Sequence, residues 1–332
     1  MNIQTSLGVF RRYLMWIRYD GSRFPEFAKG LNGYGVVDTF QRCLERCIYP
    51  TQASTSKIFL APSSRTDSGV HALRTSIIVH APLETQGGLD DNQARKSSFL
   101  DEMNILMNHV APDGFQLLNF HSVHPGFCCR KHVSYRRYVY RLIVAKNDDI
   151  YTRMPNIELI SDGHYSWLLP PNFNIEKAAN ICRKLEGLHN FASFFKHPRR
   201  DQLTDPYWNT MKVLNNVSIS KGEGYALTSP DHHYYNITII SRSFIREQIR
   251  RLVAVIAAHA CGRLSEKDVQ WLLETPHPQN FFAFRGMKAA PPNGLFLADV
   301  VYDQEAFTNP NPVVSHAWDL AKDENCDVDL SG

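Results

Sequence analysis

No long hydrophobic run is present in this sequence, although 43% of its 332 residues are hydrophobic. A membrane-spanning helix needs about 20 consecutive apolar residues, and no stretch approaches that length, so an integral membrane protein is excluded. No long apolar segment precedes the first predicted strand, so we also expect no secretory signal. The length suffices for two domains or one large one, and a charged fraction of 21% is typical of a soluble globular protein.

Signatures of cofactor and disulfide chemistry are scarce as well. The sequence contains neither a Walker P-loop nor a G-x-G-x-x-G dinucleotide fingerprint. Its seven cysteines are irregularly spaced, which favours a reducing compartment over a disulfide framework. Cys43 and Cys47 lie four residues apart on a predicted helix, where packing is favoured over a metal or redox role.

One group of histidines and cysteines suggests a zinc site. His121, His124, Cys128 and Cys129 lie close together in the sequence. Their spacing matches no standard zinc finger or ribbon, and no second pair of ligands stands at a suitable distance. We therefore expect no metal site.

Acidic residues are concentrated at one end of the chain. The whole sequence has 36 basic and 33 acidic residues, and residues 303–332 hold seven of the acids and one lysine. The remainder therefore has 35 basic and 26 acidic residues, a net charge of +9. A basic body can attract a phosphate backbone. Residues 304–332 contain few apolar side chains, and we predict that they form an acidic, poorly ordered tail.

Hydrophobic periodicity predicts a mixture of helices and strands. Helical spacing predicts helices over residues 36–48, 97–109, 175–187, 244–260 and 266–274. Alternation and short apolar runs predict strands over residues 13–19, 58–61, 77–79, 115–123, 135–144, 211–220 and 234–241. Residues 150–172 are rich in proline and polar side chains, which favours a connecting loop.

The stretch of residues 63–72, S-S-R-T-D-S-G-V-H-A, joins two of the predicted strands. Asp-Ser-Gly supplies turn chemistry, so an ordinary turn accounts for part of this pattern. The stretch also places Arg65, Asp67 and His71 within seven residues, on a loop held by two buried strands. Such a loop is suited to a functional site.

Two later segments add candidate residues, each with a structural alternative. Tyr138 lies in the alternating strand Y-R-R-Y-V-Y-R-L-I-V, where a tyrosine commonly fills the core but can also stack on a base. Arg246, Arg250 and Arg251 lie off the apolar stripe of a predicted helix. They form either a solvated face or a set of cations for an anionic partner.

These segments together resemble the TruA family of pseudouridine synthases. Residues 65–72 resemble the family signature R-T-D-x-G-V-H, and further matches follow in the family's order from Tyr13 to about Tyr302. They comprise Y-D-G at 19–21, F-C-C-R at 127–130, R-R-Y-V-Y at 136–140, F-A-S-F at 191–194, F-I-R-E-Q-I-R at 244–250 and A-P-P-N-G-L-F-L at 290–297.

The resemblance implies a role for each matched position. Asp67 would be the catalytic nucleophile, Arg250 its ion-pair partner, and Tyr138 the ring that stacks on the uracil. Leu295 would form an apolar wall below the base. Arg65 would fill the space that the flipped nucleotide leaves. The remaining predicted substrate-binding residues are Arg130, Arg136 and Arg137.

The resemblance also implies an overall fold and a reaction. We expect an α+β fold in which two related domains, residues 10–122 and 123–303, join mostly antiparallel sheets into a continuous platform. Helices would cover one side, and the catalytic cleft would lie between the domains. The reaction would isomerise a specific uridine in tRNA, or also in mRNA, by base flipping. It requires no redox change or energy input, so no cofactor is implied.

Two departures from the family pattern affect these expectations. Residues 24–28, F-P-E-F-A, replace the usual glutamine-rich stretch, so RNA contacts cannot be transferred there. Ser63-Ser64 stands where many relatives have glycine, which is similar to the mitochondrial pseudouridine synthase-like branch. We expect a mitochondrial location, with cytoplasm or nucleus as alternatives. Residues 1–12 contain Arg11 and Arg12 and no acid, which fits a presequence and a frayed end equally well.

Structured RNA, tRNA above all, is the expected partner. We expect no membrane association, and we expect a homodimer.

Two other functions are compatible with parts of the pattern. A catalytically silent RNA-binding or RNA-folding protein would need the basic cleft but not Asp67. An aspartate-dependent hydrolase would need a metal-binding carboxylate set or a second carboxylate acid, and neither stands near residues 63–72.

Overall fold

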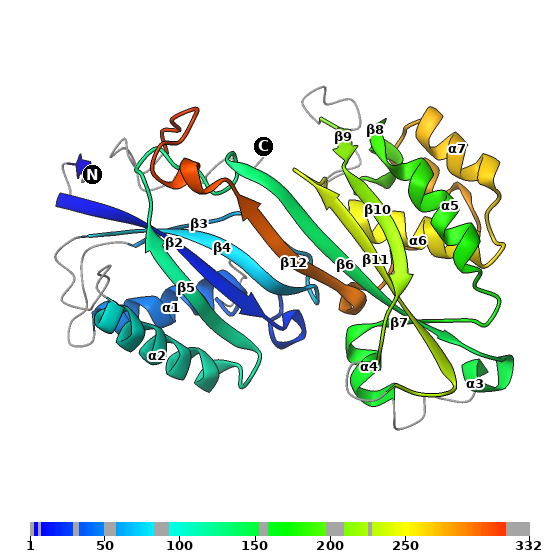
Figure 1. Cartoon of the computed structure of the whole chain (residues 1–332), viewed down its shortest axis with the longest axis horizontal. Coiled ribbons are helices and arrows are strands. Elements are labelled where there is room, and N and C mark those ends of the chain that lie inside the picture. Colours follow the sequence, from blue (N-terminus) through cyan, green and yellow to red (C-terminus); the bar gives the residue numbers. More distant parts are fainter. Residues whose placement is uncertain are drawn as a thin grey trace. The chain divides into compact units, whose positions relative to one another are not determined.

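The computed structural model describes residues 3–5, 8–28, 33–49, 58–82, 93–152, 159–196, 209–224 and 228–316. The chain divides into two compact units (Figure 1). One comprises Met1–Ser134 and Asp299–Gly332, and the other comprises Tyr135–Ala298. The chain leaves the first unit along strand β6 (Val133–Ala145) and returns to it along strand β12 (Leu295–Tyr302).

Strand β2 (Gly8–Tyr19) organises the sheet of the first unit. It pairs antiparallel with β1 (Ile3–Thr5), β4 (His71–Pro82) and β5 (Phe115–Ser122), and β3 (Phe59–Pro62) pairs antiparallel with β4. All five residues from Tyr13 to Ile17 are buried, which explains why the strand is a continuous apolar run. Helix α1 (Val36–Ile48) packs against helix α2 (Gln93–Val110), and α2 packs against β5.

The second unit contains further paired strands and a group of helices. Strand β11 (His232–Ser241) pairs antiparallel with both β6 and β10 (Asn216–Lys221), while β7 (Trp167–Leu169) pairs parallel with β6. Strands β8 (Gly187–Asn190) and β9 (Met211–Leu214) form a separate two-stranded sheet. The helices are α3 (Asp148–Thr152), α4 (Leu159–Tyr165), α5 (Ile175–Leu185), α6 (Gln248–Ala260) and α7 (Glu266–Glu274).

Helix α5 covers β10 and packs against α6, which is buried along almost its whole length. Short 3-10 helices are η1 (Gly21–Arg23), η2 (Ala192–Phe194), η4 (Asn280–Ala283), η5 (Pro292–Gly294) and η6 (Gln304–Phe307). The combination of helices with mostly antiparallel sheets confirms the coarse fold class. The continuous platform, the cleft and the domain bounds 10–122 and 123–303 stay predictions. No helix in the described ranges is long and apolar enough to span a bilayer.

Three local predictions differ from the structure. Helix α6 begins at Gln248 rather than at residue 244, because Glu247 adopts a left-handed backbone conformation with φ 59°. The predicted loop over residues 150–172 is wrong in part, since it contains α4 and β7. The predicted strand over residues 211–220 is interrupted at Asn215, so that its two halves pair with different partners.

The tail also differs from its prediction. Up to His316 it packs onto the first unit, where the Val314 amide donates to the Gly126 carbonyl at 2.9 Å. Phe307 is the reason, because its ring contacts the buried ring of Phe127 at a centroid distance of 5.2 Å. The prediction of disorder rested on the acidic composition, which does not take the packing of one aromatic side chain into account. Residues 317–332 of the predicted tail lie outside the described residues.

The predicted packing role of Cys43 and Cys47 is confirmed, since both are buried in α1. Burial raises the pKa of Cys47 to about 12 and that of Cys182, in α5, to about 12. Because the thiolate is the reactive form, we expect iodoacetamide at pH 8 to modify both far more slowly in the native protein than in urea. Peptide mass spectrometry would measure this, and equal rates in the two conditions would contradict it.

Candidate active site

Asp67 stands at the start of a tight turn between β3 and β4. The Val70 amide donates to the Asp67 carbonyl at 3.1 Å, and Gly69 between them has φ 78°. Glycine adopts that conformation without a steric penalty. The turn keeps the Asp67 side chain partly exposed, as a carboxylate that meets a substrate must be.

The base of this loop is fixed by a buried serine. The Ser63 amide donates to the Ser76 carbonyl at 2.9 Å, which continues the β3–β4 pairing by one residue. The Ser63 hydroxyl lies 3.3 Å from the Thr75 hydroxyl, and Ser63 is 1% exposed. The serine that departs from the usual glycine therefore anchors the loop to β4.

A second segment, residues 19–27, supports the loop from the side. The hydroxyls of Tyr19 and Thr66 are hydrogen bonded at 2.8 Å, and the Ser68 hydroxyl donates to the Pro25 carbonyl at 2.7 Å. These bonds reach the two residues that flank Asp67 in the sequence. The loop is thus held at both sides of its carboxylate.

The unusual residues 24–28 have a structural explanation in this support. Phe24 and Phe27 are buried, and both rings contact the ring of Tyr19, at centroid distances of 6.4 and 5.9 Å. Phe24 also packs edge-on against Phe115 at 5.2 Å. The aromatic pair fixes Tyr19, whose hydroxyl bonds to Thr66 in the loop that carries Asp67.

Gly21 and His71 close the same junction. A Cβ atom at Gly21 would lie 2.1 Å from the Val70 carbonyl oxygen, so only glycine permits this backbone approach. The buried His71 has its Nδ1 atom 2.9 Å from an Asp20 carboxylate oxygen and 3.2 Å from the Gly21 amide nitrogen. The Asp20-Gly21 turn therefore packs directly against the turn that carries Asp67.

Arg65 and Arg130 also belong to the first unit. Partial burial lowers the pKa of Arg65, and the positive charge of Arg130 lowers it further. The backbone before Arg130 is fixed, since the Cys129 thiol donates to the Ala61 carbonyl at 3.2 Å and the Tyr302 hydroxyl donates to the Cys129 carbonyl at 2.7 Å. The charges of Arg65 and Arg130 therefore act on each other, and a bound anion would offset their repulsion.

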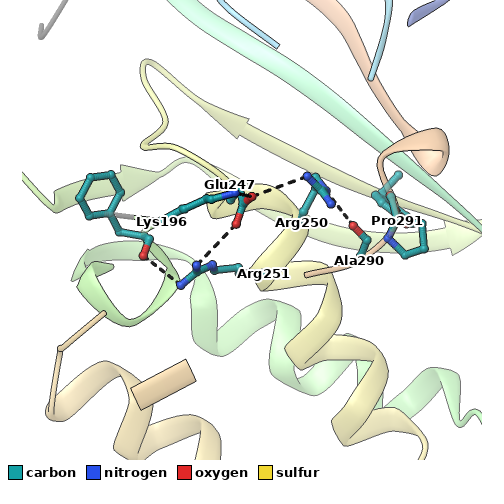
Figure 2. A network of polar contacts seen from close by, with 8 residues as sticks. Lys196, Glu247, Arg250, Arg251, Ala290 and Pro291 are labelled. Carbon is teal, nitrogen blue, oxygen red and sulfur yellow. Dashed lines mark hydrogen bonds and ion pairs between the residues drawn. The ribbon is translucent and has the colours of Figure 1, made fainter. Parts of the chain in front are cut away.

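Arg250 occupies the first turns of α6 in the second unit. Its Nε donates to the Ala290 carbonyl at 2.7 Å, and the Ala290 amide donates to the Arg250 carbonyl at 3.0 Å. Figure 2 shows the guanidinium between Ala290 and the carboxylate of Glu247, which lies 3.9 Å from an Arg250 Nη atom. The side chain is 16% exposed, so its direction is set by fixed partners rather than by solvent.

Tyr140 joins the Ala290-Pro291 segment to β6. Its hydroxyl donates to the Pro291 carbonyl at 2.7 Å. Burial raises the pKa of Tyr140, and the charge of Arg250 offsets this only in part, so the hydroxyl remains a donor. A Cβ atom at Gly294 would lie 2.8 Å from the Tyr140 ring, so the turn before Leu295 is pressed against that ring.

The other predicted residues of the second unit differ in exposure. Tyr138 is 7% exposed and packs edge-on against Phe244 at a centroid distance of 5.2 Å. Leu295 is buried at the start of β12. Arg136 is buried and donates to the Arg242 carbonyl, whereas Arg137 is exposed on the opposite side of β6.

The predicted site residues are distributed over both units. The first unit holds Asp67, Arg65 and Arg130, and the second holds Arg250, Tyr138, Leu295, Arg136 and Arg137. Sequence analysis missed the supporting residues of both sets, which are Tyr19, Ser68, Tyr140, Glu247 and Tyr302. Tyr19, Ser68, Tyr140 and Glu247 lie in segments that match the family pattern, but nothing in the sequence indicated which partners their side chains have.

The histidines and cysteines near residue 124 have ordinary structural contacts. His124 Nδ1 accepts the Gly126 amide at 3.0 Å, and the His121 ring packs against Phe307 at 4.7 Å. Within the described ranges, no three side chains of metal-ligating type come together. The His124 and Cys129 contacts stabilise the segment that precedes Arg130.

Comparison with known proteins identifies similar chains. A family model described as tRNA pseudouridine synthase matches residues 181–303. The "tRNA pseudouridine synthase-like 1" proteins of Xenopus laevis and Homo sapiens are 28% and 27% identical over 298 and 305 residues, covering 88% of this chain and 91% and 90% of theirs. The "tRNA pseudouridine synthase A" of Pseudothermotoga lettingae is 23% identical over 287 residues, covering 86% of this chain and 98% of its own.

Proposed function

Because the chain belongs to the TruA family of pseudouridine synthases, within its tRNA pseudouridine synthase-like branch, we propose that it isomerises a specific uridine of tRNA to pseudouridine. The observation that carries the proposal is Asp67, which occupies the aspartate position of the family signature. It stands in a turn whose two flanking side chains are hydrogen bonded to a buttressing segment. A preorganised carboxylate of this kind is what a reaction at a sugar carbon requires.

Pseudouridine formation exchanges one bond to the ribose for another. The C1′–N1 bond breaks, the uracil turns, C5 bonds to C1′, the hydrogen at C5 leaves as a proton, and N1 takes up a proton from water. Asp67 starts the exchange by attacking the ribose or by removing its 2′ proton. The atoms balance without an oxidant, a reductant or an energy source, so the reaction needs no cofactor.

The other residues of the proposed site supply charge and surface. Arg250 takes the position of the family's arginine that pairs with the catalytic aspartate, so its proposed role is ion-pair partner of Asp67. Tyr138 provides the aromatic surface for the flipped base. Support for Arg250 comes from the hydrogen bond to the Ala290 carbonyl, which fixes the direction of its guanidinium.

In the proposed complex, Arg65 and Arg130 of the first unit contact the RNA backbone. The paired charges of Arg65 and Arg130 suit a phosphate group, and a salt-dependent affinity for tRNA follows. Leu295, Arg136 and Arg137 complete the proposed substrate contacts.

We propose a mitochondrial location and a homodimer on the same family grounds. Cell fractionation would test the location, and light scattering would test the oligomeric state.

Tritium release tests the reaction directly. With tRNA transcripts labelled at uridine C5, the purified protein is expected to release tritium to water, because the C5 hydrogen is lost. One equivalent per modified site should be released without added nucleotide, metal or redox reagent. No release from any tRNA of the source cell would overturn the proposal. Mapping pseudouridines with and without the protein, in mitochondrial and cytosolic RNA separately, would identify the uridine and the compartment.

A further inference from the structure

Glu247 has an unusual place in the second unit. It is the N-cap of α6, with φ 59° and ψ 3°, a left-handed conformation that costs a residue other than glycine about 1 kcal/mol or more. Together with Asp113 it is one of two such residues in the described ranges. Its side chain is only 13% exposed. A glycine or an asparagine would adopt this backbone more easily, so the glutamate side chain must contribute something.

The carboxylate of Glu247 is surrounded by three cations (Figure 2). The nearest nitrogens of Lys196, Arg251 and Arg250 lie at 2.8, 3.5 and 3.9 Å from its oxygens. Burial alone would raise the pKa of Glu247, but the hydrogen bond and charge of Lys196 and the charges of the two arginines lower it. Glu247 is therefore ionised at neutral pH.

Two of the three cations have partners that account for their positions. Arg251 is 4% exposed, donates to the Phe195 carbonyl at 2.9 Å, and lies over the Phe281 ring at 4.9 Å. Lys196 is 46% exposed, so its ion pair with Glu247 is largely solvated. The amide of Lys196 also donates to the Arg246 carbonyl at 3.0 Å, which holds its backbone independently of the carboxylate.

Arg250 depends on Glu247 in a different way. Its Nε donates to the Ala290 carbonyl at 2.7 Å, which fixes one edge of the guanidinium group. Rotation of the guanidinium plane about this hydrogen bond has to be restricted by other groups. Glu247, three residues earlier on the same helix, attracts an Nη atom from the opposite side. At 3.9 Å this is an electrostatic contact rather than a hydrogen bond, and it also offsets the repulsion between Arg250 and Arg251.

We infer that Glu247 is a positioning residue for the isomerisation, whose carboxylate holds the Arg250 guanidinium in the orientation that serves the catalytic aspartate. The inference rests on the proposed function, because it gives Arg250 its role. It explains why a strained glutamate is present where a glycine would relieve the backbone. The strain and the carboxylate are properties of one residue, so substitutions can separate them.

Two substitutions separate charge from backbone strain. Glu247→Gln removes the charge and retains the shape, while Glu247→Gly removes the side chain and relieves the backbone. Both are expected to lower kcat at least 10-fold, with KM for tRNA within about 3-fold, since small misplacements of a catalytic group have effects of this size. The melting temperature of the glycine variant should equal or exceed that of the glutamine variant.

Glu266→Gln is the matched control. Glu266 forms an exposed ion pair with Lys184 at 2.7 Å on α7, away from Arg250 in the sequence and in its contacts. Loss of this ion pair in Glu266→Gln should leave kcat unchanged. If Glu247→Gly retained kcat within twofold, or if kcat merely followed the melting temperature among the variants, Glu247 would be a structural residue and the inference would be wrong.

A readout independent of activity separates this inference from the proposed function. The Nε–H resonance of Arg250 in a ¹H–¹⁵N spectrum reports its bond to Ala290. Glu247→Gln should shift it, and Glu266→Gln should not. If the wild-type protein is inactive but Glu247→Gln still shifts the Arg250 resonance, only the proposed function is refuted. An active protein with an unmoved resonance and an unmoved kcat in Glu247→Gln would refute the positioning role alone.

Discussion

Asp67→Asn is expected to abolish pseudouridine formation, lowering kcat by at least about 10³-fold, which is the usual scale for removing a nucleophile. The amide has nearly the shape of the carboxylate but neither its charge nor its basicity. Affinity for tRNA should stay within a few-fold, because phosphate contacts come from cations. Tritium release and filter binding would measure the two quantities.

Asp113→Asn is the matched control for this substitution. Asp113 has φ 57° in an exposed turn, a conformation that asparagine tolerates well. Its activity should equal that of the wild type. Near wild-type turnover by a clean preparation of Asp67→Asn would remove the assignment of Asp67. An inactive variant with unimpaired RNA function in cells would instead favour the RNA-folding alternative.

Gly21→Ala is expected to have the second largest effect, although Gly21 has no chemical role. The added Cβ would lie 2.1 Å from the Val70 carbonyl oxygen and 2.6 Å from its carbon. These are backbone atoms, so no side chain can rotate away. We expect a loss of about 1–3 kcal/mol in the free energy of unfolding, as for other overpacked sites. A displaced catalytic turn should also lower kcat by about 10²-fold.

Urea unfolding and tritium release would measure these effects, and Gly163→Ala supplies the control. No atom lies within 4 Å of a Cβ placed at Gly163, which is in α4 and has no positive φ. Alanine there should be neutral or slightly stabilising. A Gly21→Ala protein with wild-type kcat would show that the turn tolerates a shifted Val70.

Local signals predicted the elements whose residues decide their own conformation. The helical spacing predicted both ends of α1 and both ends of α7, and in the structure a capping box of Ser265 and Asp268 fixes the start of α7. The start of α6 was missed because the apolar stripe continues to Phe244 and gives no sign of the left-handed conformation of Glu247, whose nearest ion-pair partner, Lys196, lies 51 positions earlier. Phe307 similarly orders the tail through contacts with residues nearly two hundred positions away.

The site was predictable only where the family signature names a residue. The bonds that support the signature connect positions far apart, such as Tyr19 with Thr66 and Ser68 with Pro25. A hydroxyl can bond to almost any neighbour, so its partner is set by the tertiary structure and not by spacing. The pattern of β6 could indicate an inward face for Tyr138 but not the edge-on contact with Phe244.

The discontinuous make-up of the first unit has a consequence for synthesis on the ribosome. Tyr302 bonds to Ser76 and to the Cys129 carbonyl, both of which emerge long before it. Until translation has passed residue 302, the nascent polypeptide holds Asp67 and Arg130 in a unit that lacks its last strand. The unit encoded in the middle of the message can complete its own packing first. Synthesis of β12, rather than emergence of the loop around Asp67, then marks the moment at which the first unit can complete its packing.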